Sequence, residues 1–165
     1  MSSPVADPIA LARENWEREG WAEAAEGMVA VTSVMRAQQI FQARVDEVLR
    51  PFGLTFARYE LLMLLHFSSR GSMPLKKASE RLQVHPTSIT NAVDRLEAAG
   101  LVTRSPHPTD GRATLIAVTD EGRRTALKAT DVLNAEVFAR PGLAPRRLTT
   151  LVNVLEDLRR GAGDF

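Results

Sequence analysis

The stretch HPTSITNAVDRLEAAG, residues 85–100, decides the fold of this chain. Its apolar residues recur every three to four positions, which is the spacing of one buried face of an amphipathic helix. Pro86 suits the first position of that helix, and Gly100 suits the left-handed residue that follows its end. The opposite face carries short polar side chains where a solvated helix usually carries Lys and Glu. These are Thr87, Asn91 and Asp94, with Ser88, Thr90 and Arg95 on the flanks.

Taken alone, this polar face has two interpretations. It is either an ordinary solvated surface, whose hydroxyls near the helix start also act as caps, or a surface that approaches a partner closely. Hydroxyl, amide and guanidinium groups are the types that hydrogen-bond to base edges and phosphates in a major groove of DNA. The neighbouring segments therefore have to decide between the two.

Residues 75–82 (LKKASERL) are predicted to form a short helix, and the turn QVH joins it to the quoted helix, which indicates a helix-turn-helix. After the quoted helix, LVTRSP and RATLIAVT are rich in strand-forming residues on either side of HPTDG, which predicts a β-hairpin. We therefore predict a mainly α fold with a small β-hairpin wing. Its core is a winged helix-turn-helix.

Long helices are predicted on both sides of this core. Asp7 and Pro8 can open a first helix that Gly20 breaks, and residues 21–49 continue as a long second helix. Residues 56–68 follow Thr55 as a cap, with leucines and Phe67 expected in the core. Thr119 can cap a helix to about residue 138, and residues 145–160 form a last helix with a strict apolar stripe.

Composition sets the broad class of the protein. The chain has 165 residues, 44% hydrophobic and 25% charged, which fits a soluble globular domain. Neither a membrane span nor a secretory signal is recognised, so a cytoplasmic location is expected. The net charge is only +1, but residues 70–112 carry seven Lys or Arg against four acids. The absence of cysteine excludes disulfides, a Cys-based zinc site and thiol redox sensing.

From about Leu75 to Gly122 the chain resembles the MarR family of winged-helix transcriptional regulators. The resemblance rests on the order and spacing of LKKASERL, HPTSITNAVDRLEAAGLVTR, DGR at 110–112 and TDEG at 119–122. It implies that long helices from both chain ends form a two-fold dimer. The chain then divides into N-terminal helices of the dimerisation region (7–54), a DNA-binding winged helix-turn-helix (55–118) and C-terminal dimerisation helices (119–165).

The resemblance makes residues 86–98 a recognition helix and residues 102–118 the wing. In the wing it implies that Asp110 steadies the hairpin and that Arg112 enters the minor groove, although a tight turn with two solvated charges also explains PTDG. Asp94 would be repelled by phosphate, so it either accepts from a cytosine amino group or pairs with a nearby Arg. Lys76 and Lys77 are either phosphate contacts or solvated. The candidate DNA-binding residues are Thr87, Ser88, Thr90, Asn91, Arg95, Arg104, Asp110, Arg112, Lys76 and Lys77.

Members of the family commonly bind a small aromatic or anionic effector between the dimerisation helices and the winged domain. The apolar and aromatic members of the candidate ligand-binding set suit a protein core equally well. The set consists of Trp16, Trp21, Met35, Tyr59, Glu60 and His66. A tryptophan on the N-terminal helix, together with Glu60 and Arg104, resembles the urate-responsive branch. That branch has an Arg where this chain has Ala92, and the departure argues against urate.

Two other classes of function compete with a DNA-binding regulator. The three histidines lack metal-ligand spacing and no nucleophile or phosphate-loop motif occurs, so an enzyme, a metal site and a cofactor are not expected. A winged-helix module that binds a protein partner is the alternative. We predict a homodimeric repressor that binds a pseudo-palindromic operator in double-stranded DNA and is released by a small effector.

Overall fold

The computed structural model describes residues 6–110 and 113–165. They form two compact units that divide between Val45 and Asp46. The first contains α1 (Pro8–Arg18) and most of α2 (Ala22–Leu49). Asp7 caps α1 by accepting from the amide of Ile9, and Gly20, at φ +85°, separates the two helices as predicted. Arg13 pairs with Glu26, so an ion pair connects α1 to α2.

The second unit confirms the predicted fold class. It begins with the end of α2 and a 3₁₀ turn (Arg50–Phe52). Its remaining elements are α3 (Phe56–Phe67), β1 (Ser72–Pro74), α4 (Leu75–Leu82), α5 (Pro86–Ala98), β2 (Val102–Pro106), β3 (Thr114–Val118), α6 (Asp120–Leu133), a π-helical turn (Asn134–Phe138) and α7 (Pro145–Gly161). The division of the chain into dimerisation and DNA-binding regions stays a prediction.

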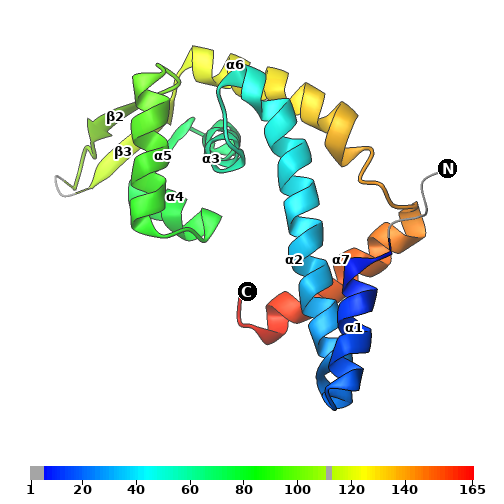
Figure 1. Ribbon diagram of the computed structural model, residues 1–165. Coiled ribbons are helices and arrows are strands. Elements are labelled where there is room, and N and C mark those ends of the chain that lie inside the picture. Colours follow the sequence, from blue (N-terminus) through cyan, green and yellow to red (C-terminus); the bar gives the residue numbers. More distant parts are fainter. Residues whose placement is uncertain (1–5, 111–112) are drawn as a thin grey trace. The chain divides into compact units, whose positions relative to one another are not determined.

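The sheet is antiparallel with strand order β1-β3-β2. β2 and β3 form the predicted hairpin, with Val102 opposite Val118, and Figure 1 shows it beside α5. β1 was not predicted. It has only three residues, too few for an alternating pattern, and it ends in Pro74, which is tolerated because the strand lies at the sheet edge.

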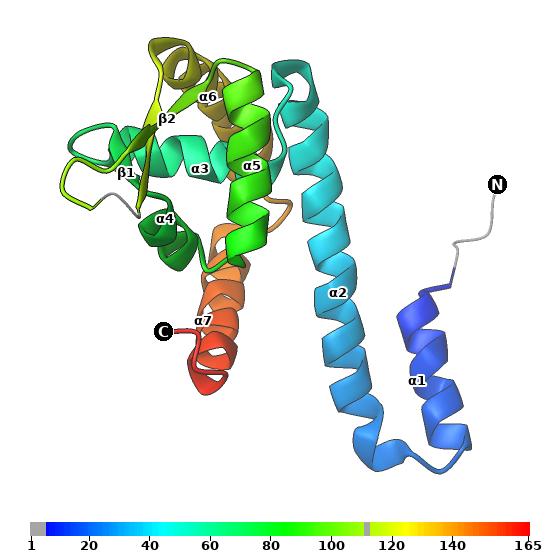
Figure 2. The same ribbon diagram turned by 90° about the vertical axis from the view of Figure 1, so that its left-hand side faces the viewer.

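Helix α3 is the centre of the second unit. It packs against α4, α5, α6 and the sheet, and Figure 2 shows it crossing behind α5. Its residues Leu61, Leu62 and Leu65 are fully buried, in keeping with the expected core. The expectation for Phe67 was wrong, because its side chain is 75% exposed at the end of α3. The buried apolar stripe of α3 ends two residues before it, at Leu65.

The end of α5 is tied to the start of α6 through Thr119. Its hydroxyl donates to the carbonyl of Gly100 (2.8 Å) and accepts from the amide of Gly122 (3.0 Å), while its amide donates to the carbonyl of Leu101 (3.0 Å). Gly122 packs directly on this crossing, since a β-carbon placed there would lie 2.0 Å from the Leu101 carbonyl oxygen. The TDEG sequence therefore has a packing reason for its glycine.

Candidate DNA-binding surface

The turn between α4 and α5 is fixed by local hydrogen bonds. The buried hydroxyl of Ser79 donates to the carbonyl of Val84 (2.7 Å), and Gln83 takes the left-handed conformation at φ 52°. His85 caps α5, because its Nδ1 accepts from the amide of Thr87 (3.2 Å). These bonds fix the turn of the helix-turn-helix that α4 and α5 form.

The predicted faces of α5 are present in the structure. Ile89, Val93 and Leu96 are buried against the domain, with Val93 completely enclosed. The predicted contact residues on the other side are exposed, apart from the half-buried Thr90: Thr87, Ser88, Asn91 and Arg95. Thr90 donates its hydroxyl to the carbonyl of Pro86 (2.9 Å), so it also stabilises the first turn. Arg95 makes no ion pair within residues 6–110 and 113–165, and its charge is available to a partner.

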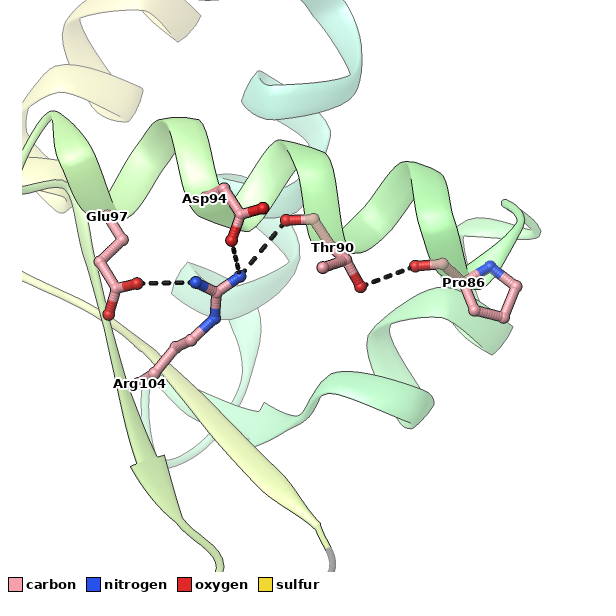
Figure 3. Close-up of polar contacts among 5 residues, drawn as sticks. All are labelled: Pro86, Thr90, Asp94, Glu97 and Arg104. Carbon is pink, nitrogen blue, oxygen red and sulfur yellow. Dashed lines mark hydrogen bonds and ion pairs between the residues drawn. The ribbon is translucent and has the colours of Figure 1, made fainter.

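Arg104 on β2 reaches across to α5 and holds it at three points (Figure 3). Its guanidinium pairs with Asp94 (2.6 Å) and with Glu97 (2.7 Å), and it also donates to the backbone carbonyl of Thr90 (3.3 Å). Asp94 therefore pairs with an arginine, which was one of the two alternatives for this residue. Glu97 was not predicted as part of the site, although it lies one helical turn from Asp94 on the same side of α5.

The environment of Arg104 keeps this contact charged. Burial lowers the pKa of its guanidinium, but the hydrogen bonds and negative charges of Asp94 and Glu97 together outweigh burial and raise the pKa. The side chain is 25% exposed, against 54% for Asp94. Because three of its donors are used inside the protein, Arg104 joins the wing to α5 whether or not it also meets DNA.

The other candidate residues lie on either side of α5. Lys76 on α4 pairs with Glu80 at 3.9 Å, whereas Lys77 makes no ion pair in the described part of the chain. Asp110 is exposed at the hairpin turn, where its carbonyl accepts from the amide of Ala113 (2.9 Å). Arg112 lies outside the described residues. The DNA-contact roles of all these side chains stay predictions.

The candidate ligand-binding residues are shared between the two units. Trp16 meets Trp21 edge-on in the first unit, at 5.5 Å between ring centres, and Met35 is exposed on α2. Tyr59, Glu60 and His66 lie on α3 in the second unit. An effector pocket formed by these six residues stays a prediction.

The three α3 residues occupy different surroundings. Tyr59 is buried, and its hydroxyl is 3.0 Å from that of Thr130 on α6. His66 Nδ1 lies 2.8 Å from the guanidinium of Arg123. Glu60 lines a small cavity of about 30 Å³ beside Ser88 and Ala92, and burial raises its pKa. Tyr59 and His66 thus already have partners inside the domain.

Two kinds of site were not found among the described residues. No group of three or more His, Cys, Asp or Glu side chains is placed to hold a metal ion there. Within the same ranges, no helix combines the length and the apolar character that crossing a membrane requires.

Known proteins are similar to this chain in sequence and in fold. A model of the MarR family matches residues 54–114. The chain is 38% identical over 85 residues to the HTH-type transcriptional regulator YhbI of Bacillus subtilis, an alignment that covers 52% of this chain and about half, 54%, of YhbI.

Two solved structures cover more of the chain. Sco5413, a MarR family transcriptional regulator from Streptomyces coelicolor, is 48% identical with a TM-score of 0.78, over 85% of this chain and 97% of Sco5413. Sco3205, a MarR family regulator from the same organism solved in complex with DNA, is 28% identical with a TM-score of 0.71, over 83% of this chain and 88% of Sco3205.

Proposed function

This chain belongs to the MarR family of transcriptional regulators, and from that premise we propose that it binds double-stranded DNA sequence-specifically as a homodimer and represses transcription. The observation that carries the proposal is the outward face of α5. Its short polar side chains are exposed, while Arg104 fixes the helix to the neighbouring wing. A helix held in this way can enter a major groove with its side chains already positioned.

The charges around α5 fit this role. Arg95 is exposed and unpaired among the described residues, and Lys77 on α4 is likewise exposed. By contrast, Arg104 has its charge compensated by two carboxylates. In the proposed complex Arg95 and Arg112 supply the phosphate and minor-groove contacts, and Asn91 with Thr87 reads base edges.

Exposed apolar residues support the homodimer. In α7, Val152, Val154 and Leu158 are each more than half exposed, and in α2 the same holds for Val31 and Met35. Helices that leave such side chains in water are typical of surfaces that a second copy covers. A two-fold dimer would place its recognition helices about 34–36 Å apart, one turn of DNA, which predicts a pseudo-palindromic operator.

Repression and an effector complete the proposal. A dimer that occupies a promoter blocks polymerase without any further contact surface, so we favour repression, a non-enzymatic role and a location in the cytoplasm with the chromosome. A small aromatic or anionic effector would release the DNA. Trp16 and Trp21 are the only tryptophans, so quenching of intrinsic fluorescence by benzoate tests directly for a ligand near α1.

Selection of bound sequences from a random duplex pool tests the function as a whole. We expect a pseudo-palindromic motif, and binding that weakens steeply with salt by about one unit of log-log slope per phosphate contact. Asn91→Ala should relax the preference at particular base pairs, and Arg112→Ala should weaken binding on all sequences. Absent or sequence-independent binding, combined with tight binding to a protein partner, would favour the interaction module instead.

A further inference from the structure

A polar pocket lies apart from the exposed face of α5. Its volume is about 630 Å³, within the range of small-ligand pockets. It is formed by the loop between α3 and β1, by one side of α4 and by residues 107–109 of the hairpin. We call it the basic pocket, because its wall carries Arg70, Lys77 and Arg81 together with His107.

The charges of the basic pocket are not compensated. None of the described residues that line it is acidic, and Arg70, Lys77 and Arg81 make no ion pair with any residue in the described ranges. Some exposed arginines on other helices are paired at the spacing of one turn, as in Arg124 with Glu121 and Arg160 with Glu156. The basic pocket instead brings three cationic side chains, unpaired among the described residues, into one cavity wall.

Lys77 and Arg81 stand four residues apart on α4, so their charges repel one another along the same helix face. Such a pair destabilises an isolated helix only slightly, and an anion bound between the two groups would remove the repulsion. The pair therefore favours a negatively charged ligand at this position.

The loop that presents Arg70 is held in place. Ser68 donates its hydroxyl to the carbonyl of Ser72 (3.2 Å), and the carbonyl of Gly71 accepts from the amide of Val118 (3.0 Å). Gly71 has φ +63°, and a β-carbon there would lie 3.1 Å from the guanidinium of Arg123, so the backbone turns where a larger residue would be strained. Arg70 thus projects from a hydrogen-bonded turn.

An aromatic ring completes the pocket. Phe67, 75% exposed, also lines it, although the residues before it on α3 are core. An exposed ring beside arginine and lysine suits a ligand that joins a flat organic group to an anion. The planar guanidinium of arginine can donate two parallel hydrogen bonds to the oxygens of a phosphate, which fits that group better than a single point charge does.

We propose that the basic pocket is a phosphate-binding site in which Arg70, Lys77 and Arg81 hold the phosphate oxygens. The phosphate can come from the backbone of bound DNA or from a free phosphorylated small molecule. Binding of a DNA phosphate in this pocket rests on the proposed function, whereas binding of a free phosphorylated molecule does not.

The test compares two double variants of the full-length chain. K77Q/R81Q removes a Lys and an Arg four residues apart from the basic pocket. R124Q/K128Q removes the same two residue types at the same spacing from the exposed surface of α6 and serves as the control. Binding of inorganic pyrophosphate is measured by calorimetry, and the salt dependence of binding is measured on the selected duplex and on a random one.

If the site takes a free phosphate, pyrophosphate binds the wild type and the control, K77Q/R81Q loses at least about tenfold in affinity, and the salt slope is unchanged. If it takes a DNA phosphate, the salt slope of K77Q/R81Q falls by about one unit per lost contact, while the control keeps the wild-type slope.

The proposal is overturned if K77Q/R81Q matches the control in both measurements. Should the wild type bind no DNA, the proposed function fails but the pyrophosphate measurement still decides this site. Absence of both DNA and pyrophosphate binding to the wild type overturns both proposals.

Discussion

Helices α5 and α7 have the same kind of sequence and opposite surroundings. Both repeat apolar residues every three to four positions and both begin at a proline. In α5 the stripe of Ile89, Val93 and Leu96 is almost completely buried by the domain, whereas in α7 Leu158 is 61% exposed. Periodicity thus defines an apolar face without defining what covers it. The apolar face of α5 is covered by other parts of the same chain. The apolar face of α7 includes side chains that this chain leaves exposed, and we propose that a second copy covers them.

The largest difference between α5 and α7 is expected when a leucine of each helix is truncated to alanine. Leu96→Ala leaves a cavity in the core and should lower the free energy of unfolding by about 2–5 kcal/mol. Leu158→Ala removes a largely exposed side chain and should change the stability of the monomer by less than about 0.5 kcal/mol. Urea unfolding, at protein concentrations low enough to keep the chain monomeric, measures both. Equal losses would mean that α7 is covered within the monomer.

A charge on the exposed stripe should act on assembly instead. Leu158→Asp places a carboxylate where the second copy is proposed to pack, and we expect the dimer dissociation constant to rise by at least about tenfold, or 1.4 kcal/mol. Asn153→Asp adds the same charge to an exposed position of α7 and is the matched control. Sedimentation velocity over a concentration series measures the dimer dissociation constant of both variants. Equal dissociation constants for the two variants would show that α7 is not part of the dimer interface.

Ion pairs extend the comparison to polar contacts. Arg104 joins β2 to α5 at 25% side-chain exposure, whereas Arg160 pairs with Glu156 on α7 at 62%. Arg104→Ala should lower the free energy of unfolding by about 1 kcal/mol, since it leaves Asp94 and Glu97 facing each other, while Arg160→Ala should change it by less than about 0.5 kcal/mol. Thermal unfolding of both variants at two salt concentrations measures the two losses, because salt screens the exposed pair more than the partly buried one. A larger loss for Arg160→Ala would contradict the assignment of Arg104.

The smallest effect is expected at Glu60, behind α5. Burial raises the pKa of this carboxyl above its ordinary value of 4.5, so folding disfavours the ionised form. This penalty is absent below pH 4.5 and grows as the pH rises through the raised pKa. Glu60→Gln should therefore raise the unfolding temperature at pH 7.5 by up to about 2 °C and leave it unchanged at pH 4. A gain of the same size at both pH values would exclude ionisation as the cause.

Local sequence was sufficient for most elements and for the faces of α5, because helix caps, glycines and periodicity act over a few residues. It was insufficient where distant segments meet. β1 exists only because β3 pairs with it, and Phe67 is exposed because the core ends at Leu65. Pairing with an arginine was one of two alternatives for Asp94, and the identity of that arginine depends on β2 lying beside α5. The basic pocket likewise combines a loop, a helix and a hairpin that no short pattern connects.

The crossing at Thr119 has a mechanical consequence. Hydrogen bonds to Gly100, Leu101 and Gly122 leave no slack between the end of α5 and the start of α6, and Tyr59 with Thr130 holds α6 to α3 farther along. α3, α5 and α6 are therefore joined within the second unit by packing and by hydrogen bonds near both ends of α6. A displacement of α6 would reach α5 through backbone-anchored bonds and not through a loose linker.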